Sequence, residues 1–258
     1  MKRIFTLIAL SILVGGSSAR AQESAASAAL LRKVDSLVAF MDTDVSAEYR
    51  IEKRDPGGST SITVAAMFRR DRTNQFLILI LEPVSDKGKG YLKEGDNLWL
   101  YDPVGKSFTF TSAKERFQNS SFRNSDFNRF NFSGDYRAVA NSREQLGKFS
   151  CTVLNLEARN DRVSFPKVKL WISDDGLVRK MEDYSLSGQL MRTTAIPSYQ
   201  KVGSRWLPLS MVIVDHLKFR SIGGKMEYER TTVTISNPSL NKLPDSTYTK
   251  EYLEKVSR

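Results

Sequence analysis

Residues 45–70 read VSAEYRIEKRDPGGSTSITVAAMFRR, and this stretch decides the fold. From Val45 to Ile51, apolar residues alternate with polar ones, which is the period of a β-strand with one face in water. The triplet Pro56-Gly57-Gly58 then turns the chain, and the run from Thr60 to Arg69 has the composition of a second strand. The stretch therefore predicts an antiparallel hairpin.

Similar strand patterns, separated by short turn signals, continue along most of the chain. They fall at residues 74–81, 91–101 (as two short strands), 107–111, 151–156, 168–172, 177–184, 190–198, 209–219 and 225–235. About ten or eleven strands in one unit favour a single antiparallel sheet that curls toward a barrel, because a flat sheet of that width is unusual. The expected fold class is mainly β, of the α+β type.

An amphipathic helix is predicted before the first strand. Its apolar residues recur at spacings of one, three and four and share one face: Leu30, Leu31, Val34, Leu37, Val38 and Met41. The residues Arg32, Lys33, Asp35 and Asp42 are expected to point elsewhere. Because the apolar stripe is one-sided, the helix is expected to lie against an apolar surface.

The regular pattern stops between Ser112 and Ser133. Five phenylalanines stand there among polar residues, at gaps that fit neither a helix nor a strand: Phe117, Phe122, Phe127, Phe130 and Phe132. Two interpretations are open. The segment is either a loop pinned to the outside of the sheet by aromatic anchors, or a movable cover over the mouth of an apolar cavity. The second interpretation makes Phe117, Phe122 and Phe130 lid candidates.

The first twenty-one residues predict a secretory signal peptide. Lys2 and Arg3 precede an apolar run from Ile4 to Val14, and Ala19-Arg20-Ala21 offers small residues at a cleavage site. The run is too short to span a bilayer as a helix, which takes about 20 residues. We expect residues 1–21 to be cleaved, residues 22–258 to form a single domain, and the mature protein to be periplasmic.

The net charge weakens once the signal peptide is removed. Cleavage removes three of the 39 cations and none of the 29 acids, so the formal charge falls from +10 to +7. The remaining basic residues form short scattered pairs, and no nucleic-acid fold signature is present. The charge is therefore compatible with anionic lipid headgroups or with plain solubility, and no nucleic-acid partner is expected.

The scarcity of His and Cys limits the possible chemistry. A lone Cys151 and a lone His216 cannot build a His/Cys zinc site or an internal disulfide, so no metal and no cofactor is predicted. Cys151 reads as a buried structural residue within a strand. Asp215 and His216 are adjacent in one strand, which directs their side chains to opposite faces. No Gly-x-Ser-x-Gly elbow occurs, so we name no catalytic residue; an acyl-ester hydrolase that uses His216 is kept as an alternative.

Six motifs, taken in order, resemble one known family. They are KGKGYL (87–92), DNLWLYDP (96–103), NSDF (124–127), KLWI (169–172), YQKVGSRWLP (199–208) and LPDSTYTKEYL (243–253). The chain resembles the outer-membrane lipoprotein-sorting, or LolA-like, proteins over the whole mature sequence from about Leu30. It departs from their pattern at Asn124, where Gly is usual, and at Asp102, where an apolar residue is common.

This resemblance implies an unclosed β-barrel, a half-barrel whose apolar concave face is covered by helices. It also implies a carrier that shields acyl chains of lipoproteins or phospholipids during transfer toward the outer membrane. An inner-membrane transporter and an outer-membrane acceptor would then be its partners. A periplasmic regulator that senses lipid with the same fold is an alternative that the resemblance leaves open.

The candidate cavity residues follow from strand parity. We expect the lining to comprise Phe76, Ile78, Ile80, Trp99, Tyr101, Phe108, Phe110 and Phe127. The alternative is that half of them simply fill the core beneath the helix. Trp171 and Trp206 are interpreted as strand-edge and turn anchors. Arg69 and Arg70 could hold a headgroup at the cavity mouth, although solvent exposure explains them as well.

Overall fold

A computed structural model describes residues 24–257 of the chain. The predicted signal peptide and its cleavage after Ala21 lie outside the described residues. No helix among residues 24–257 is long and apolar enough to cross a membrane.

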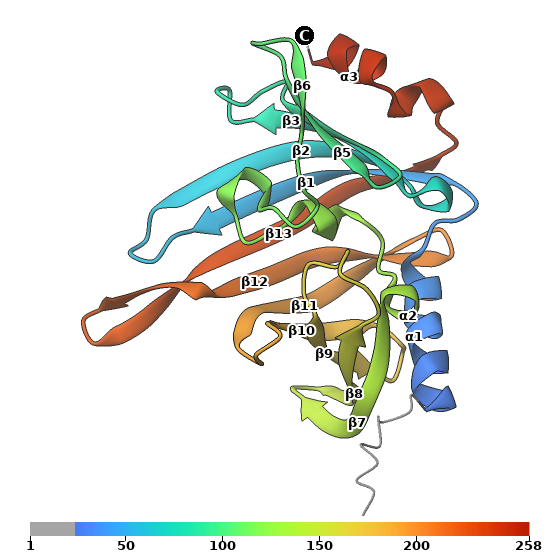
Figure 1. Cartoon of the computed structure of the whole chain (residues 1–258), viewed down its shortest axis with the longest axis vertical. Coiled ribbons are helices and arrows are strands. Elements are labelled where there is room, and N and C mark those ends of the chain that lie inside the picture. The colour runs from blue at the N-terminus through green and yellow to red at the C-terminus, as the bar shows by residue number, and fades with distance from the viewer. Residues whose placement is uncertain (1–23, 258) are drawn as a thin grey trace, which may run out of the picture.

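One sheet of thirteen antiparallel strands forms the body of the protein (Figure 1). The strands are β1 (Asp44–Arg54), β2 (Thr60–Arg70), β3 (Gln75–Glu82), β4 (Gly90–Glu94), β5 (Asn97–Asp102), β6 (Ser107–Phe110), β7 (Tyr136–Leu146), β8 (Phe149–Ala158), β9 (Lys167–Ser173), β10 (Val178–Tyr184), β11 (Leu190–Val202), β12 (Arg205–Ile222) and β13 (Lys225–Asn241). They lie in the order β6-β5-β4-β3-β2-β1-β13-β12-β11-β10-β9-β8-β7. Since β6 and β7 are free edges, the barrel is unclosed. The predicted fold class is confirmed, with thirteen strands instead of about ten or eleven.

The edge strand β7 has no counterpart among the predicted strands. Residues 140–145 within it are all exposed. From Asn141 to Gln145 the strand is polar on both faces and lacks the apolar alternation from which strands are recognised, so its pairing with β8 identifies it. The sequence of this part of β7 therefore lacks the alternation of apolar and polar residues that would have predicted a strand.

The strand order forces one long connection across the sheet. Strands β6 and β7 are consecutive in the chain but lie at opposite edges, so residues 111–135 must pass over one face to join them (green in Figure 1). We call residues 111–135 the crossing segment. It contains only short helices: η2 (Phe117–Asn119), η3 (Asn124–Phe127) and α2 (Phe132–Asp135).

The N-terminal helix α1 (Ala25–Val38) packs beside the end of the crossing segment. Leu31, Val34 and Val38 are buried as expected, but the helix ends before Met41, which is 43% exposed. The prediction that Asp35 points away was wrong. Its carboxylate is buried and accepts hydrogen bonds from the backbone N–H groups of Phe132 and Ser133, each at 2.8 Å, because the first N–H groups of α2 have no partner within their own helix.

The C-terminal helix α3 (Lys250–Val256) covers the opposite face of the sheet near β4. Leu253 joins Leu77 and Leu92 in a buried cluster. The cluster also contains Tyr248, the last residue of the short helix η4 (Asp245–Tyr248). Gly90 in the KGKGYL motif permits this contact, since a Cβ there would lie 2.4 Å from Leu253 Cδ1. The glycine is needed for close approach of the helix to the strand.

Candidate functional site

The concave face of the sheet carries a large apolar surface, which we call the trough. Phe76, Ile78 and Ile80 of β3 project into it, each at most 1% exposed. Phe127 of the crossing segment packs there as well, with its ring centroid 6.0 Å from that of Phe76 and 5.2 Å from that of Tyr49. Four of the eight predicted cavity residues are thus brought together.

The other four predicted residues lie on the opposite face. Trp99, Tyr101 and Phe108 pack in the cluster beneath α3, where Lys250 Nζ lies 3.3 Å from the Trp99 ring centroid. Phe110 is 66% exposed and stacks on Trp99, with the ring centroids 3.6 Å apart. The expectation that all eight share one cavity is therefore wrong.

The register of β4 explains this split. Leu77 pairs with Leu92, and Leu92 pairs with Trp99, so these three side chains share a face that Phe76 does not. Parity within each strand could be predicted from the sequence. The relative parity of β3 and β5 depends on the turns between them, and a shift of one residue exchanges the faces.

The crossing segment fills the trough instead of lying on the outside of the sheet. Phe117 and Phe122 are fully buried against Phe127, with ring centroids 4.9 Å and 4.8 Å from it, both in edge-to-face contact. Phe130 is half-buried. The interpretation of the segment as a loop pinned to the outside of the sheet is therefore wrong. The segment lies over the apolar face, where the interpretation as a cover placed it.

Little space remains in the trough with the crossing segment seated. A cavity of about 30 Å³ lies between Tyr49, Arg69, Phe130 and Trp206, which is room for only a few water molecules. Trp206, interpreted as a turn anchor, also lines this cavity. The three phenylalanines thus fill most of the trough.

One row of charged residues crosses the concave face. Asp183, Arg192, Asp215 and Glu229 are direct cross-strand partners on β10, β11, β12 and β13. All four are buried. On β12, Asp215 follows the buried apolar residues Met211 and Ile213 at alternate positions, and this interruption is a sequence signal by which it could have been found.

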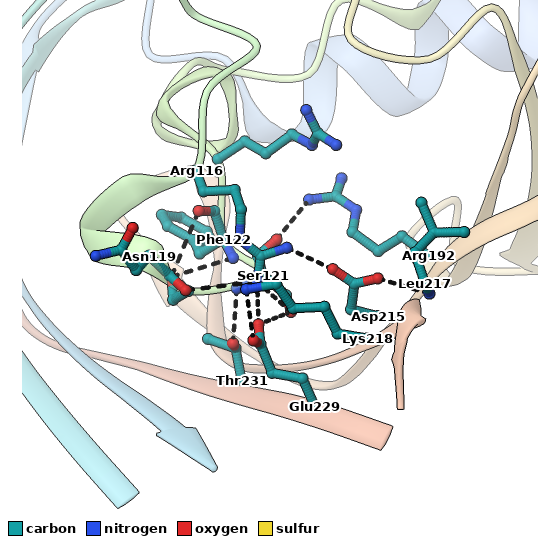
Figure 2. Close-up of polar contacts among 12 residues, drawn as sticks. Arg116, Asn119, Ser121, Phe122, Arg192, Asp215, Leu217, Lys218, Glu229 and Thr231 are labelled. Carbon is teal, nitrogen blue, oxygen red and sulfur yellow. Dashed lines mark hydrogen bonds and ion pairs between the residues drawn. The ribbon is translucent and has the colours of Figure 1, made fainter. Parts of the chain in front are cut away.

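Residues next to Phe117 and Phe122 hold the crossing segment to this row of charged residues (Figure 2). The guanidinium of Arg116 is ion-paired with both Asp215 and Glu229. Ser121 adds two contacts: its Oγ donates to Glu229 Oε1 at 2.6 Å, and its backbone N–H donates to Thr231 Oγ1 at 3.0 Å. Arg116 of the segment and Lys218 of β12, whose Nζ lies 3.2 Å from Glu229, together balance the charges of the two acids.

A second fastening lies near Phe127. Arg192 binds Asp126 of the crossing segment at 2.6 Å and Asp183 of β10 at 2.7 Å. Burial alone would lower the pKa of Arg192, but the two carboxylates outweigh burial and raise that pKa. Burial raises the pKa of Asp183. The guanidinium stays charged and holds the segment electrostatically.

Lys93 provides a third fastening from β4. Its ammonium donates to Asn128 of the crossing segment and to Asn74, each at 2.7 Å. Burial lowers the pKa of Lys93 to about 8. Together the three fastenings are polar, whereas the surface they hold in place is apolar.

Arg69 and Arg70 are buried in ion pairs, so solvent exposure does not explain them. Arg69 pairs with Asp71 at 2.7 Å and borders the small cavity. Arg70 binds both carboxylate oxygens of Asp44 at 3.0 Å and stacks on Tyr248. Of the two, only Arg69 is placed where it could meet a ligand headgroup.

His216 lies on the face opposite the trough. Its Nε2 is 2.9 Å from Thr193 Oγ1 and its ring contacts Tyr228, while Asp215 points inward to Arg116. The prediction that Asp215 and His216 do not pair is confirmed. Cys151 is fully buried, as predicted, in a cluster with Val153 and Trp171. Within residues 24–257, no group of His, Cys, Asp and Glu is arranged to hold a metal ion.

Comparison with known proteins gives one family match and several similar structures. A family model with the description "Uncharacterized protein" matches residues 72–255. A LolA superfamily protein of Nitrosomonas europaea is 26% identical, with a TM-score of 0.73, over 87% of this chain and 97% of that one. No curated protein matches the chain.

Two more solved structures share the fold at lower identity. An outer membrane lipoprotein-sorting protein domain from Vibrio parahaemolyticus is 17% identical, with a TM-score of 0.76, over 88% of this chain and 97% of that one. A DUF1329 family protein from Desulfovibrio piger is also 17% identical, with a TM-score of 0.77, over 88% and 98%. The resemblance drawn from the six motifs is confirmed: the chain has the fold of the LolA-like proteins, and it belongs to the family of the matching model.

Proposed function

We propose that this protein is a periplasmic carrier that shields the acyl chains of lipids or lipoproteins during transfer toward the outer membrane. The observation that carries the proposal is the crossing segment, whose Phe117, Phe122 and Phe127 fill an apolar trough on the concave face. In the loaded protein, acyl chains would take the place of these three rings. The donor and acceptor would be membrane proteins at the two membranes.

The energies of the two states support an exchange of this kind. Burial of three phenylalanine side chains contributes about 5–9 kcal/mol. Two acyl chains contribute on the order of 10 kcal/mol or more, at roughly 0.8 kcal/mol for each buried methylene. Because these amounts are similar, loading and release would both be reversible, which a carrier requires.

The polar contacts that hold the crossing segment suit a cover that must close over the trough and also open. The segment contacts the trough mainly through side chains, and its ion pairs at Arg116 and Asp126 join it to strands that remain paired without it. Breaking these polar contacts exposes groups that water can solvate, so the cost of opening is smaller than that of separating two strands.

A disulfide that locks the segment tests the proposal. The backbone N of Ser121 lies 3.0 Å from Thr231 Oγ1, so the two residues are neighbours, and the lock to be tried is Ser121→Cys with Thr231→Cys. The native Cys151 does not interfere, because it is buried and burial raises the pKa of its thiol. Uptake of a fluorescent fatty acid would be measured on the same protein before and after oxidation.

We expect the reduced double variant to bind the probe at least as readily as the wild-type protein, because two contacts that hold the segment are lost, and the oxidised form to lose binding. Reduction should restore uptake, and each single cysteine variant should be insensitive to oxidation. Equal uptake by the locked and unlocked forms would place the acyl site outside the trough. If wild-type protein took up no probe and carried no lipid by mass spectrometry, the carrier function would be wrong.

A further inference from the structure

The far end of the β12–β13 hairpin projects beyond the rest of the sheet (orange to red in Figure 1). β12 pairs with β11 only as far as Asp215, and β13 pairs with β1 only as far as Arg230. Beyond these positions the two strands pair with each other alone, down to Ile222 and Lys225. We call residues 216–229 the ribbon.

The ribbon carries an unusual concentration of exposed apolar side chains. Residues 217–228 are all exposed. Within residues 24–257, eleven large hydrophobic residues are exposed, and five of them lie in the ribbon at 37–54% exposure: Leu217, Phe219, Ile222, Met226 and Tyr228. A two-stranded ribbon is at best marginally stable by itself, so this apolar surface needs a function other than core formation.

One face of the ribbon is defined by the pairing register. Phe219 pairs directly with Tyr228, and their ring centroids are 5.9 Å apart. Met226 lies two residues from Tyr228 and therefore projects from the same face. An aromatic pair extended by a flexible methionine is a surface that can enter an apolar phase without a shape-matched pocket.

The charges of the ribbon and its base are predominantly positive. Lys218, Arg220, Lys225 and Arg230 are exposed. Of the acids nearby, Asp215 and Glu229 are buried in ion pairs with Arg116, and Glu229 also pairs with the half-exposed Lys218 at 3.2 Å, which leaves Glu227 as the exposed acid of the ribbon. Cations flanking apolar and aromatic side chains complement a surface that is anionic outside and apolar within.

We propose that the ribbon is a docking element for an anionic phospholipid bilayer, with Phe219, Met226 and Tyr228 entering the headgroup region and the cations meeting lipid phosphates. A projecting ribbon can reach a flat surface that the body of the sheet cannot. Docking would also place the Arg116 fastening near the bilayer, because its partners Asp215 and Glu229 form the base of the ribbon.

Vesicle sedimentation tests this proposal. Full-length mature protein would be mixed with phosphatidylcholine vesicles, with and without phosphatidylglycerol. The apolar variant is Phe219→Ser with Met226→Ser, and the charge variant is Lys225→Gln with Arg230→Gln. The matched control is Val84→Ser with Val104→Ser, because these valines are 88% and 90% exposed in other turns. Thermal melts would verify that all variants fold.

We expect the wild type and the valine control to sediment with phosphatidylglycerol vesicles, and the apolar variant to bind at least about tenfold more weakly. The charge variant should bind roughly 30-fold more weakly, and high salt should have a similar effect. The oxidised Ser121→Cys/Thr231→Cys protein should still sediment, which separates docking from loading.

Three results would overturn the proposal. The first is wild-type protein that does not sediment with anionic vesicles. The second is binding that is equal for the ribbon variants and the wild type. The third is ribbon-dependent dimerisation in light scattering without vesicle binding, which would assign the surface to a second copy of the chain.

Discussion

Arg116 and Glu229 are 113 residues apart in the sequence, yet the guanidinium of Arg116 shares with Lys218 the ion pairing of a Glu229 carboxylate that is itself completely buried. The pair joins the crossing segment to β13 at the base of the ribbon. A buried carboxylate requires such a partner, since an uncompensated charge in the interior is costly.

Removal of Arg116 should therefore loosen the crossing segment. We expect Arg116→Met to lower the free energy of unfolding by about 3 kcal/mol, because Asp215 loses its cation and Glu229 keeps only Lys218, whose Nζ lies 3.2 Å away. Denaturant unfolding and limited proteolysis within residues 111–135 would measure the two effects. The double variant Arg116→Met/Glu229→Gln should recover part of the loss, and a purely additive double variant would show that the pair is not coupled.

Burial of the phenylalanines predicts unequal costs for the same substitution. Phe127→Ala should destabilise the protein by about 3–5 kcal/mol, because Phe127 is fully buried among other rings. Phe110→Ala, at a 66% exposed position that only stacks on Trp99, should cost about 1 kcal/mol or less. Chemical denaturation of the two variants makes the comparison. Similar losses would contradict the placement of Phe127 in the trough.

The close approach at Gly90 gives a local prediction for α3. A methyl group there would lie 2.4 Å from Leu253 Cδ1 and 2.9 Å from the Ile78 carbonyl oxygen, so Gly90→Ala should cost about 1–3 kcal/mol and release the C-terminal helix to proteases. Gly105→Ala is the matched control, because its nearest neighbour is the movable Ser107 hydroxyl at 3.2 Å. If both variants resisted proteolysis equally, the contact between Gly90 and Leu253 would not limit helix docking.

Lys93 predicts a rise in stability at alkaline pH. Burial lowers its pKa to about 8 in the folded protein, below the 10.5 of an unfolded lysine. Between these two values the unfolded state binds more protons, so the free energy of unfolding should increase by about 1–3 kcal/mol as the pH rises through this range. Below pH 8 the folded protein bears the cost of a buried charge.

The measurement is the pH dependence of urea unfolding for the wild type and for Lys93→Met. The difference between the two proteins isolates Lys93 from the tyrosines, which also titrate at high pH. Its sign is the test: the wild type should gain stability relative to the variant between pH 8 and pH 10. A constant difference would mean that the folded and unfolded pKa values of Lys93 are equal.

Local sequence patterns determined most of the secondary structure. The alternation in residues 45–70 produced the hairpin of β1 and β2, and the one-sided stripe at Leu31, Val34 and Val38 produced α1. These features depend on interactions between residues close in sequence, which a period of two or 3.6 reports directly. The motifs around Gly90 and Trp99 likewise indicated the family, because they are short stretches that can be recognised without knowledge of the strand order.

Tertiary structure alone decided where the aromatic residues point and what covers the trough. Trp99 and Phe76 lie on opposite faces because the pairing through β4 sets their relative parity, and register is a property of two or more strands together. The crossing segment enters the trough because β6 and β7 lie at opposite edges of the sheet. That order arises from the pairing of β1 with β13, between residues nearly two hundred positions apart, and no local pattern can encode it.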